Sequence, residues 1–274
     1  MHLSFLWFAM ETYLFFMLLG AVAGLSAGLL GVGGGVVMVP SLILGFSSQG
    51  FPPEVLTHMA VATSLAAMVV TAASSAFAHN KLGSVDWFAV RWMASGVLLG
   101  ALVGVVGSLQ LKGAWIQVAF GIFLMAVGLR VFIARNNVKG KLLPGPFGLA
   151  AAGSVIGAVS MVFGIGGGSM TVPLLMRYGL APKQAMGSSA ALGLPIAVLG
   201  GVLYALGGRG DQILPEFTLG YVYLPAFAGL VLLGIPFAKL GANVAHRLPE
   251  RQLKRVFGGY AMLVGALLLV RNLL

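Results

Sequence analysis

The chain has 274 residues, of which 59% are hydrophobic and only 8% are charged, and its formal net charge is +10. A soluble domain carries about 25% charged residues, so most of this surface must face lipid instead of water. Lys and Arg lie in short clusters between long apolar runs, which is typical of membrane-protein loops and argues against nucleic-acid binding. Because the chain has no cysteine, disulfides, thiolate metal sites and cysteine nucleophiles are excluded.

Eight hydrophobic blocks follow one another along the chain, and a spanning helix needs about 20 apolar residues. Their expected bounds are 12–46, 57–78, 87–109, 114–133, 147–175, 184–206, 217–238 and 256–270. The first and fifth blocks are too long for one simple span, and a glycine cluster followed by a proline interrupts each. The N-terminal segment carries Glu11 and no basic stretch, so we expect it to be retained and not cleaved as a signal peptide. The blocks predict an all-α polytopic membrane protein.

The first and fifth blocks are copies of each other. Residues 24–42 align without gaps with residues 157–175, and 8 of the 19 positions are identical. Weaker matches continue in the same order through the later blocks. The duplication therefore predicts a first transmembrane repeat at 1–133, a basic cytoplasmic linker at 134–146 and a second transmembrane repeat at 147–274. Internal repeats of this kind are common in secondary transporters.

Loop charges favour one topology over another. If each long block crosses once, Lys and Arg divide 8 against 8 between the two sides, but if each turns back at its glycines they divide 13 against 3. The positive-inside rule favours the second arrangement. It predicts two inverted repeats of four blocks, with both termini outside. The apolar runs after the glycines reach only about 18 Å of a core of about 30 Å, so we expect each first block to be broken or re-entrant.

The glycine clusters are the first candidate for a solute site. They consist of Gly33, Gly34 and Gly35 in one repeat and of Gly166, Gly167 and Gly168 in the other. Amides exposed at the start of the following half-helix would present N–H donors and a positive dipole end to an anion. Pro40 and Pro173 lie in those half-helices and remove a further backbone hydrogen bond. Close helix packing is the alternative explanation for the glycines, and a nucleotide site is disfavoured because no Lys follows them.

Paired hydroxyls are the second candidate. Thr63 and Ser64 occupy the place in the first repeat that Ser188 and Ser189 occupy in the second. Such side chains donate to an anion without carrying a charge, although they also serve as hydrogen-bonding contacts between helices. The same two interpretations apply to four hydroxyls that flank the glycines, at Ser26, Ser160, Ser169 and Thr171.

Ionisable residues argue against a cation site and against an enzyme. The carboxylates fall at block edges or in loops, at Glu11, Glu54, Asp86, Asp211, Glu216 and Glu250. The sequence therefore supports neither a carboxylate proton relay nor an acidic cage. His58 and His79 lie near block ends, where we expect solvated side chains or, for His79, a basic vestibule. No metal ligands, catalytic residues or cofactor are expected.

At these motifs the chain resembles the TauE/SafE family of sulfite-exporter-like membrane permeases. The resembling segments are Gly31-Val-Gly-Gly-Gly-Val-Val-Met-Val-Pro40, Ala60-Val-Ala-Thr-Ser-Leu65, Gly164-Ile-Gly-Gly-Gly-Ser-Met-Thr-Val-Pro173 and Gly187-Ser-Ser189. The resemblance implies a permease of a bacterial-type plasma (inner) membrane that moves a small sulfur-containing anion such as sulfite or an organosulfonate. A non-transporting receptor or assembly protein and a passive anion channel are the alternatives. The anion, the direction of transport and a coupling ion such as H+ or Na+ stay open.

Overall fold

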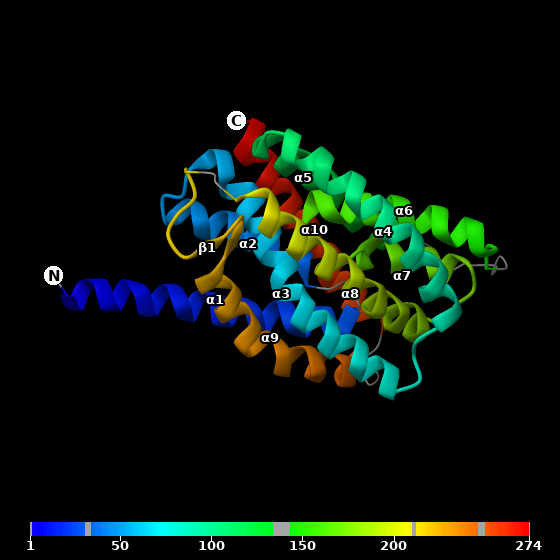
Figure 1. Cartoon of the computed structure of the whole chain (residues 1–274). Coiled ribbons are helices and arrows are strands. Elements are labelled where there is room, and N and C mark those ends of the chain that lie inside the picture. The colour runs from blue at the N-terminus through cyan, green and yellow to red at the C-terminus, as the bar shows by residue number, and fades with distance from the viewer. Residues whose placement is uncertain (1, 31–33, 134–142, 210–211, 246–249, 274) are drawn as a thin grey trace.

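The computed structural model describes residues 2–30, 34–133, 143–209, 212–245 and 250–273. In these residues it contains helices and one short hairpin: α1 (His2–Leu30), α2 (Gly35–Ser48), α3 (Pro53–Lys81), α4 (Trp87–Gln110), α5 (Gly113–Ile133), α6 (Pro146–Phe163), α7 (Gly168–Arg177), α8 (Pro182–Gly207), β1 (Thr218–Leu219), β2 (Val222–Tyr223), α9 (Leu224–Ala245) and α10 (Glu250–Leu273). The helices pack side by side in one bundle, and the two chain ends lie toward the same side of Figure 1.

The two glycine motifs interrupt the helices where the sequence predicts. In the first repeat α1 ends at Leu30 and α2 begins at Gly35, and in the second α6 ends at Phe163 and α7 begins at Gly168. The short helices contain 14 residues in α2 and 10 in α7. At 1.5 Å per residue they extend only about 21 and 15 Å, so neither crosses a hydrocarbon core of about 30 Å alone.

Helices of one repeat pack mainly against helices of the other. The main pairs are α1 with α9, α4 with α6, α3 with α8 and α5 with α10. Along the first pair, Gly20 lies against Leu230 and Gly24 against Gly234, so α1 and α9 run in the same direction. Each repeat therefore contributes half of every major interface.

Two of these pairs, α3 with α8 and α5 with α10, consist of helices that run in opposite directions. Gly200 of α8 lies against Leu65 of α3, whereas the earlier Gly193 approaches the later Ala72. The pair α5 and α10 behaves likewise, because Gly121 approaches Gly265 while a Cβ on Gly128 would meet Gly258. Both α3 with α8 and α5 with α10 are therefore antiparallel.

Small residues allow these close approaches. On α4 the glycines at Gly96, Gly100 and Gly104 are spaced four apart and face α6. A Cβ added at Gly100 would lie 1.8 Å from the carbonyl oxygen of Ser154, so the two backbones are in direct contact. This is the small-residue packing that holds helices together in lipid, where apolar side chains gain little from leaving the hydrocarbon.

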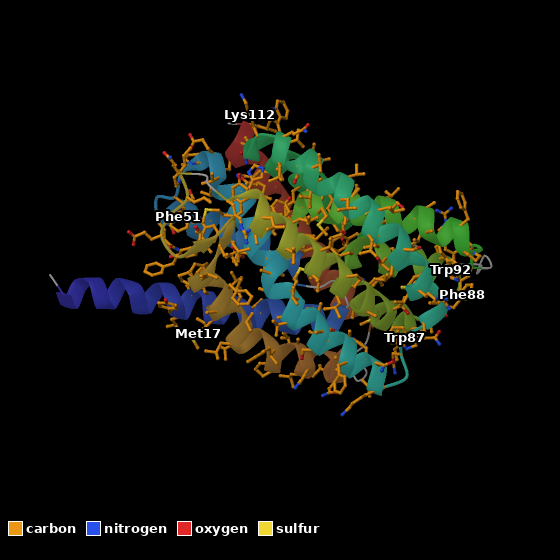
Figure 2. All side chains as sticks on the ribbon, viewed as in Figure 1. Met17, Phe51, Trp87, Phe88, Trp92 and Lys112 are labelled. Carbon is orange, nitrogen blue, oxygen red and sulfur yellow. The ribbon has the colours of Figure 1, made fainter. Side chains whose placement is uncertain are left out.

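The exterior of the bundle suits a bilayer. Within the described ranges six helices are long and apolar enough to cross a membrane, namely α3, α4, α5, α6, α8 and α9. Trp87 and Phe88 begin α4 with 58% and 52% of their surface exposed. Figure 2 places them with Trp92 at one end of the bundle and Lys112 at the other. Exposed aromatic residues at a helix end are typical of a membrane–water interface.

One expectation for the last-but-one block is wrong. The block predicted at 217–238 begins with a hairpin, in which Thr218 pairs with Tyr223 and Leu219 with Val222, and the helix starts only at Leu224. Gly220 has a φ of 55° in the hairpin turn, a left-handed conformation that glycine adopts without strain. In the part of the chain that the structure describes, the regular structure is therefore helical apart from this two-stranded element.

Candidate functional site

The two helix breaks lie against each other. A Cβ added at Gly35, the first residue of α2, would lie 2.4 Å from the carbonyl oxygen of Gly164 and 2.8 Å from the Cα of Ile165. A Cβ on Gly164 would in turn lie 2.9 Å from the Cγ2 of Val39 in α2. The start of α2 therefore touches the end of α6 in the other repeat, and only glycine fits at this contact.

Each short helix begins at a glycine in the left-handed conformation. The N-caps are Gly34, with a φ of 73°, and Gly167, with a φ of 72°. The first full-turn hydrogen bonds are donated by the amide of Met38 to Gly34, at 2.9 Å, and by the amide of Thr171 to Gly167, at 2.8 Å. The amides of Val37 and Met170 donate to the same two carbonyls, at 2.9 and 3.0 Å. The first two amides of each helix have no acceptor inside it, so both helix starts offer N–H groups and a positive dipole end.

Two other predicted glycines, Gly166 and Gly168, lie in the second break. Gly168 is the first residue of α7 and is buried. The carbonyl oxygen of Gly166 lies 3.5 Å from the position of a Cβ on Gly193, so this break is also covered by α8. Gly33 lies outside the described residues.

Both prolines lie inside the short helices, five residues after the helix start. Pro40 belongs to α2 and Pro173 to α7. Because proline has no N–H, the carbonyls of Val36 and Ser169, four residues earlier, have no donor inside their helices. Each half-helix therefore has, within its first turn, both amides and a carbonyl without a partner inside the helix.

The first hydroxyl of each pair accepts a hydrogen bond from the other repeat. Thr63 Oγ1 accepts a hydrogen bond from the amide of Tyr223, at 3.0 Å, and Ser188 Oγ accepts one from the amide of Asp86, at 2.8 Å. Tyr223 directly precedes α9 and Asp86 directly precedes α4, so the two contacts are equivalent. Each hydroxyl still has its own hydrogen with which to donate.

The second hydroxyls lie deeper. Ser64 is fully buried, and its Oγ donates to the carbonyl oxygen of Gly164 at 3.0 Å. That bond ties α3 to the second break and uses the only hydrogen of the Ser64 hydroxyl. Ser189, on α8, is also fully buried. Ser64 thus contacts the second break directly and donates to the protein in this conformation, whereas Thr63 and Ser188 contact the residues that precede α9 and α4.

Tyr204 and His79 hydrogen-bond to the last turns of α6 and α1, a role that the sequence did not predict for either residue. Tyr204 of α8 donates through its Oη to the carbonyl oxygen of Met161, at 2.9 Å, in the last turn of α6. His79 of α3 lies with its Nε2 3.1 Å from the carbonyl oxygen of Gly28, in the last turn of α1. His79 lies as far after Thr63 as Tyr204 lies after Ser188, which is the signal that could have paired them.

The expectation of solvated histidines is wrong for both candidates. His79 is 0% exposed because α3 continues to Lys81 and keeps position 79 inside the bundle. His58 is 7% exposed, and its Nε2 lies 3.0 Å from the carbonyl oxygen of Ser108 in α4. Neither therefore forms a solvated vestibule.

Among the residues whose side chains are described, the hydrogen bonds at the breaks involve no Lys, Arg, Asp or Glu. Asp86 is the N-cap of α4, and its Oδ1 accepts from the amide of Ala89 at 2.9 Å. In the same part of the chain no group of three or more His, Asp or Glu residues is arranged to hold a metal ion. The side chains with described hydrogen bonds at the breaks are the hydroxyl of Ser64, the phenol of Tyr204 and the imidazole of His79.

Comparison with known proteins gives a consistent result. The family model for the sulfite exporter TauE/SafE matches residues 16–268. A probable membrane transporter protein of Haemophilus influenzae is 36% identical over 250 residues, which are 90% of this chain and 94% of that protein. A second, of Methanocaldococcus jannaschii, is 25% identical over 93% of this chain and 94% of its own length, and a third, of Bacillus subtilis, is 26% identical over 96% and 99%. No solved structure matches the chain.

Proposed function

The chain belongs to the sulfite exporter TauE/SafE family of membrane transporters, and on that premise we propose that it is a secondary transporter for a small sulfur-containing anion. Sulfite and organosulfonates are the solutes we expect, in a bacterial-type inner membrane. The observation that carries this proposal is the contact between the two glycine breaks.

The chemistry at the breaks suits an anion. The N-caps Gly34 and Gly167 direct the starts of α2 and α7 into the interior, where their first amides are available as donors. An oxyanion accepts hydrogen bonds from such amides and from hydroxyls, and it gains from the positive end of each helix dipole. A cation would need carboxylate or carbonyl ligands. Asp86 caps the start of α4, so at the breaks the candidates are backbone carbonyls such as those of Val36 and Ser169.

We further propose that the repeats are inverted, with both termini outside and the linker in the cytoplasm. The antiparallel packing of α3 on α8 supports this, because equivalent helices of parallel repeats would run in the same direction. The division of Lys and Arg, 13 against 3, gives the orientation. Movement of one repeat against the other would then open the region between the two breaks to each side of the membrane in turn. H+ and Na+ are both candidates for the coupling ion.

Flux into proteoliposomes tests the proposal. Wild-type protein should take up radiolabelled sulfite or a small sulfonate with saturable kinetics, and Gly34→Leu and Gly167→Leu should abolish uptake by filling the breaks. Gly50→Leu is the matched control, because Gly50 has a similar φ of 75° but nothing lies within 4 Å of its Cβ position. Size-exclusion profiles establish that each variant is folded. Unchanged uptake by both folded break variants would refute the site.

A further inference from the structure

Three buried hydroxyls gather around the second break. Ser160, Ser169 and Thr171 are 0%, 7% and 0% exposed. Among the described residues none of their hydroxyl oxygens has a hydrogen-bond partner. Buried hydroxyls are almost always paired, so three unpaired ones within one stretch indicate a missing partner.

One hydroxyl lies against the N-cap of α7, and the other two belong to the first turn of that helix. Ser160 is in the last turn of α6, and its Oγ is 3.2 Å from the position that a Cβ on Gly167, the N-cap of α7, would occupy. Ser169 is the second residue of α7 and Thr171 the fourth, both within about one turn of its start. Amides without an intrahelical acceptor and hydroxyls without a partner therefore occur at the same helix end.

The first break lacks these groups. Ala27, Val36 and Met38 stand in the same places relative to Gly34 as Ser160, Ser169 and Thr171 stand relative to Gly167. All three are buried, at 1%, 1% and 0% exposure, so the positions equivalent to the three hydroxyls are buried and apolar in the first repeat. The duplication has kept the backbone break in both repeats but has hydroxyls at these three positions in only one.

We propose that the solute binds at the second break alone, where the hydroxyls of Ser160, Ser169 and Thr171 and the first amides of α7 hold the oxygens of a sulfite or sulfonate group. This inference rests on the proposed function and makes it asymmetric. The first break then serves as the packing partner, through the contact of Gly35 with Gly164. Neutral donors bind an oxyanion without a fixed counter-charge, which allows the solute to leave again.

A pair of substitutions at Thr171 separates hydrogen bonding from packing. Thr171→Val removes the hydroxyl and keeps the shape, whereas Thr171→Ser keeps the hydroxyl and removes a methyl group. For sulfite and methanesulfonate binding to purified protein, measured by isothermal titration calorimetry, Thr171→Val should raise the Kd about tenfold or more, because a hydrogen bond to a charged group is lost. Thr171→Ser should keep the wild-type Kd.

Thr71→Val is the matched control. Thr71 is a fully buried helical threonine whose hydroxyl already donates to the carbonyl oxygen of Ala67, at 3.3 Å. Its replacement should leave the Kd of the anion unchanged. Ser160→Ala and Ser169→Ala should weaken binding in the same direction as Thr171→Val.

The remaining outcomes each decide against the inference. If wild-type protein binds the anion and Thr171→Val binds it equally well, the second-break site is wrong while the proposed function stands. If Thr171→Ser weakens binding as much as Thr171→Val, Thr171 acts through packing. If Na+ alone raises the melting temperature and Thr171→Val removes that effect, the hydroxyls hold a cation. If wild-type protein neither binds nor transports any of the anions, the proposed function fails too.

Discussion

Replacing Gly167 by alanine tests how tightly the start of α7 is held. Gly167 has a φ of 72°, and an added Cβ would lie 2.8 Å from Ile156 Cγ2 and 3.1 Å from Ile196 Cδ1. The left-handed backbone costs an L-residue about 1–2 kcal/mol. Crowding a packed interior costs about 1–3 kcal/mol more. Gly167→Ala should therefore lower the free energy of unfolding by about 2–5 kcal/mol.

Gly50→Ala separates the two contributions. Gly50 has nearly the same φ, 75°, but nothing lies within 4 Å of its Cβ position. It should show only the backbone cost of about 1–2 kcal/mol. The assay is reversible unfolding in mixed micelles, with SDS added stepwise and helical circular dichroism as the readout. Equal losses for the two variants would show that the start of α7 is not packed as described, and a negligible loss at Gly50 would refute the backbone argument.

Further predictions concern the helix contacts and the topology. Gly100→Val should separate α4 from α6 and prevent stable folding, because the Cβ position is 1.8 Å from Ser154 O, whereas Gly107→Val on the same helix meets nothing within 4 Å and should give a normal size-exclusion profile. Equal profiles would contradict the α4–α6 contact. Tyr204→Phe should lower the free energy of unfolding by about 1–3 kcal/mol, because Met161 O loses its donor. Tyr13→Phe at a 47% exposed position is its control, and the argument fails if both are neutral. In this cysteine-free chain, Leu82 is the C-cap of α3, in the turn before α4, and Leu111 is the C-cap of α4. They are 45% and 46% exposed, and Leu82→Cys and Leu111→Cys should react with a membrane-impermeant maleimide from opposite sides. Labelling of both from one side would contradict the span.

The helix breaks were readable from the sequence because their cause is local. Glycine clusters and following prolines disfavour a continuous helix wherever they occur, so the ends at Leu30 and Phe163 lie beside the motifs. The hairpin before α9 was missed because residues 217–223 are apolar enough to extend the block, and only the turn at Gly220 distinguishes them. The family is confirmed, while the anion and the orientation of the termini stay predictions.

The partners of the hydroxyls could not be read from the sequence. Thr63 meets an amide 160 residues away and Ser188 one 102 residues away, and nothing local in the sequence marks such contacts. The burial of His79 also depends on α1, which the sequence places far away. Whether the predicted glycines and hydroxyls bind a solute is a prediction that no contact in the structure tests. The internal repeat was the useful guide. It pairs equivalent positions in the two halves of the chain, so the positions whose side chains differ in polarity can be identified.

Counterflow is the most direct test of the central claim that this chain carries a sulfur oxyanion by alternating access. Proteoliposomes loaded with unlabelled sulfite or methanesulfonate are diluted into a trace of the same labelled anion. The account predicts transient accumulation of label above its equilibrium level, saturating with internal anion and absent from Gly167→Leu vesicles. Label that only equilibrates, without overshoot, would indicate a passive path, and no protein-dependent entry of any of these anions would contradict the account.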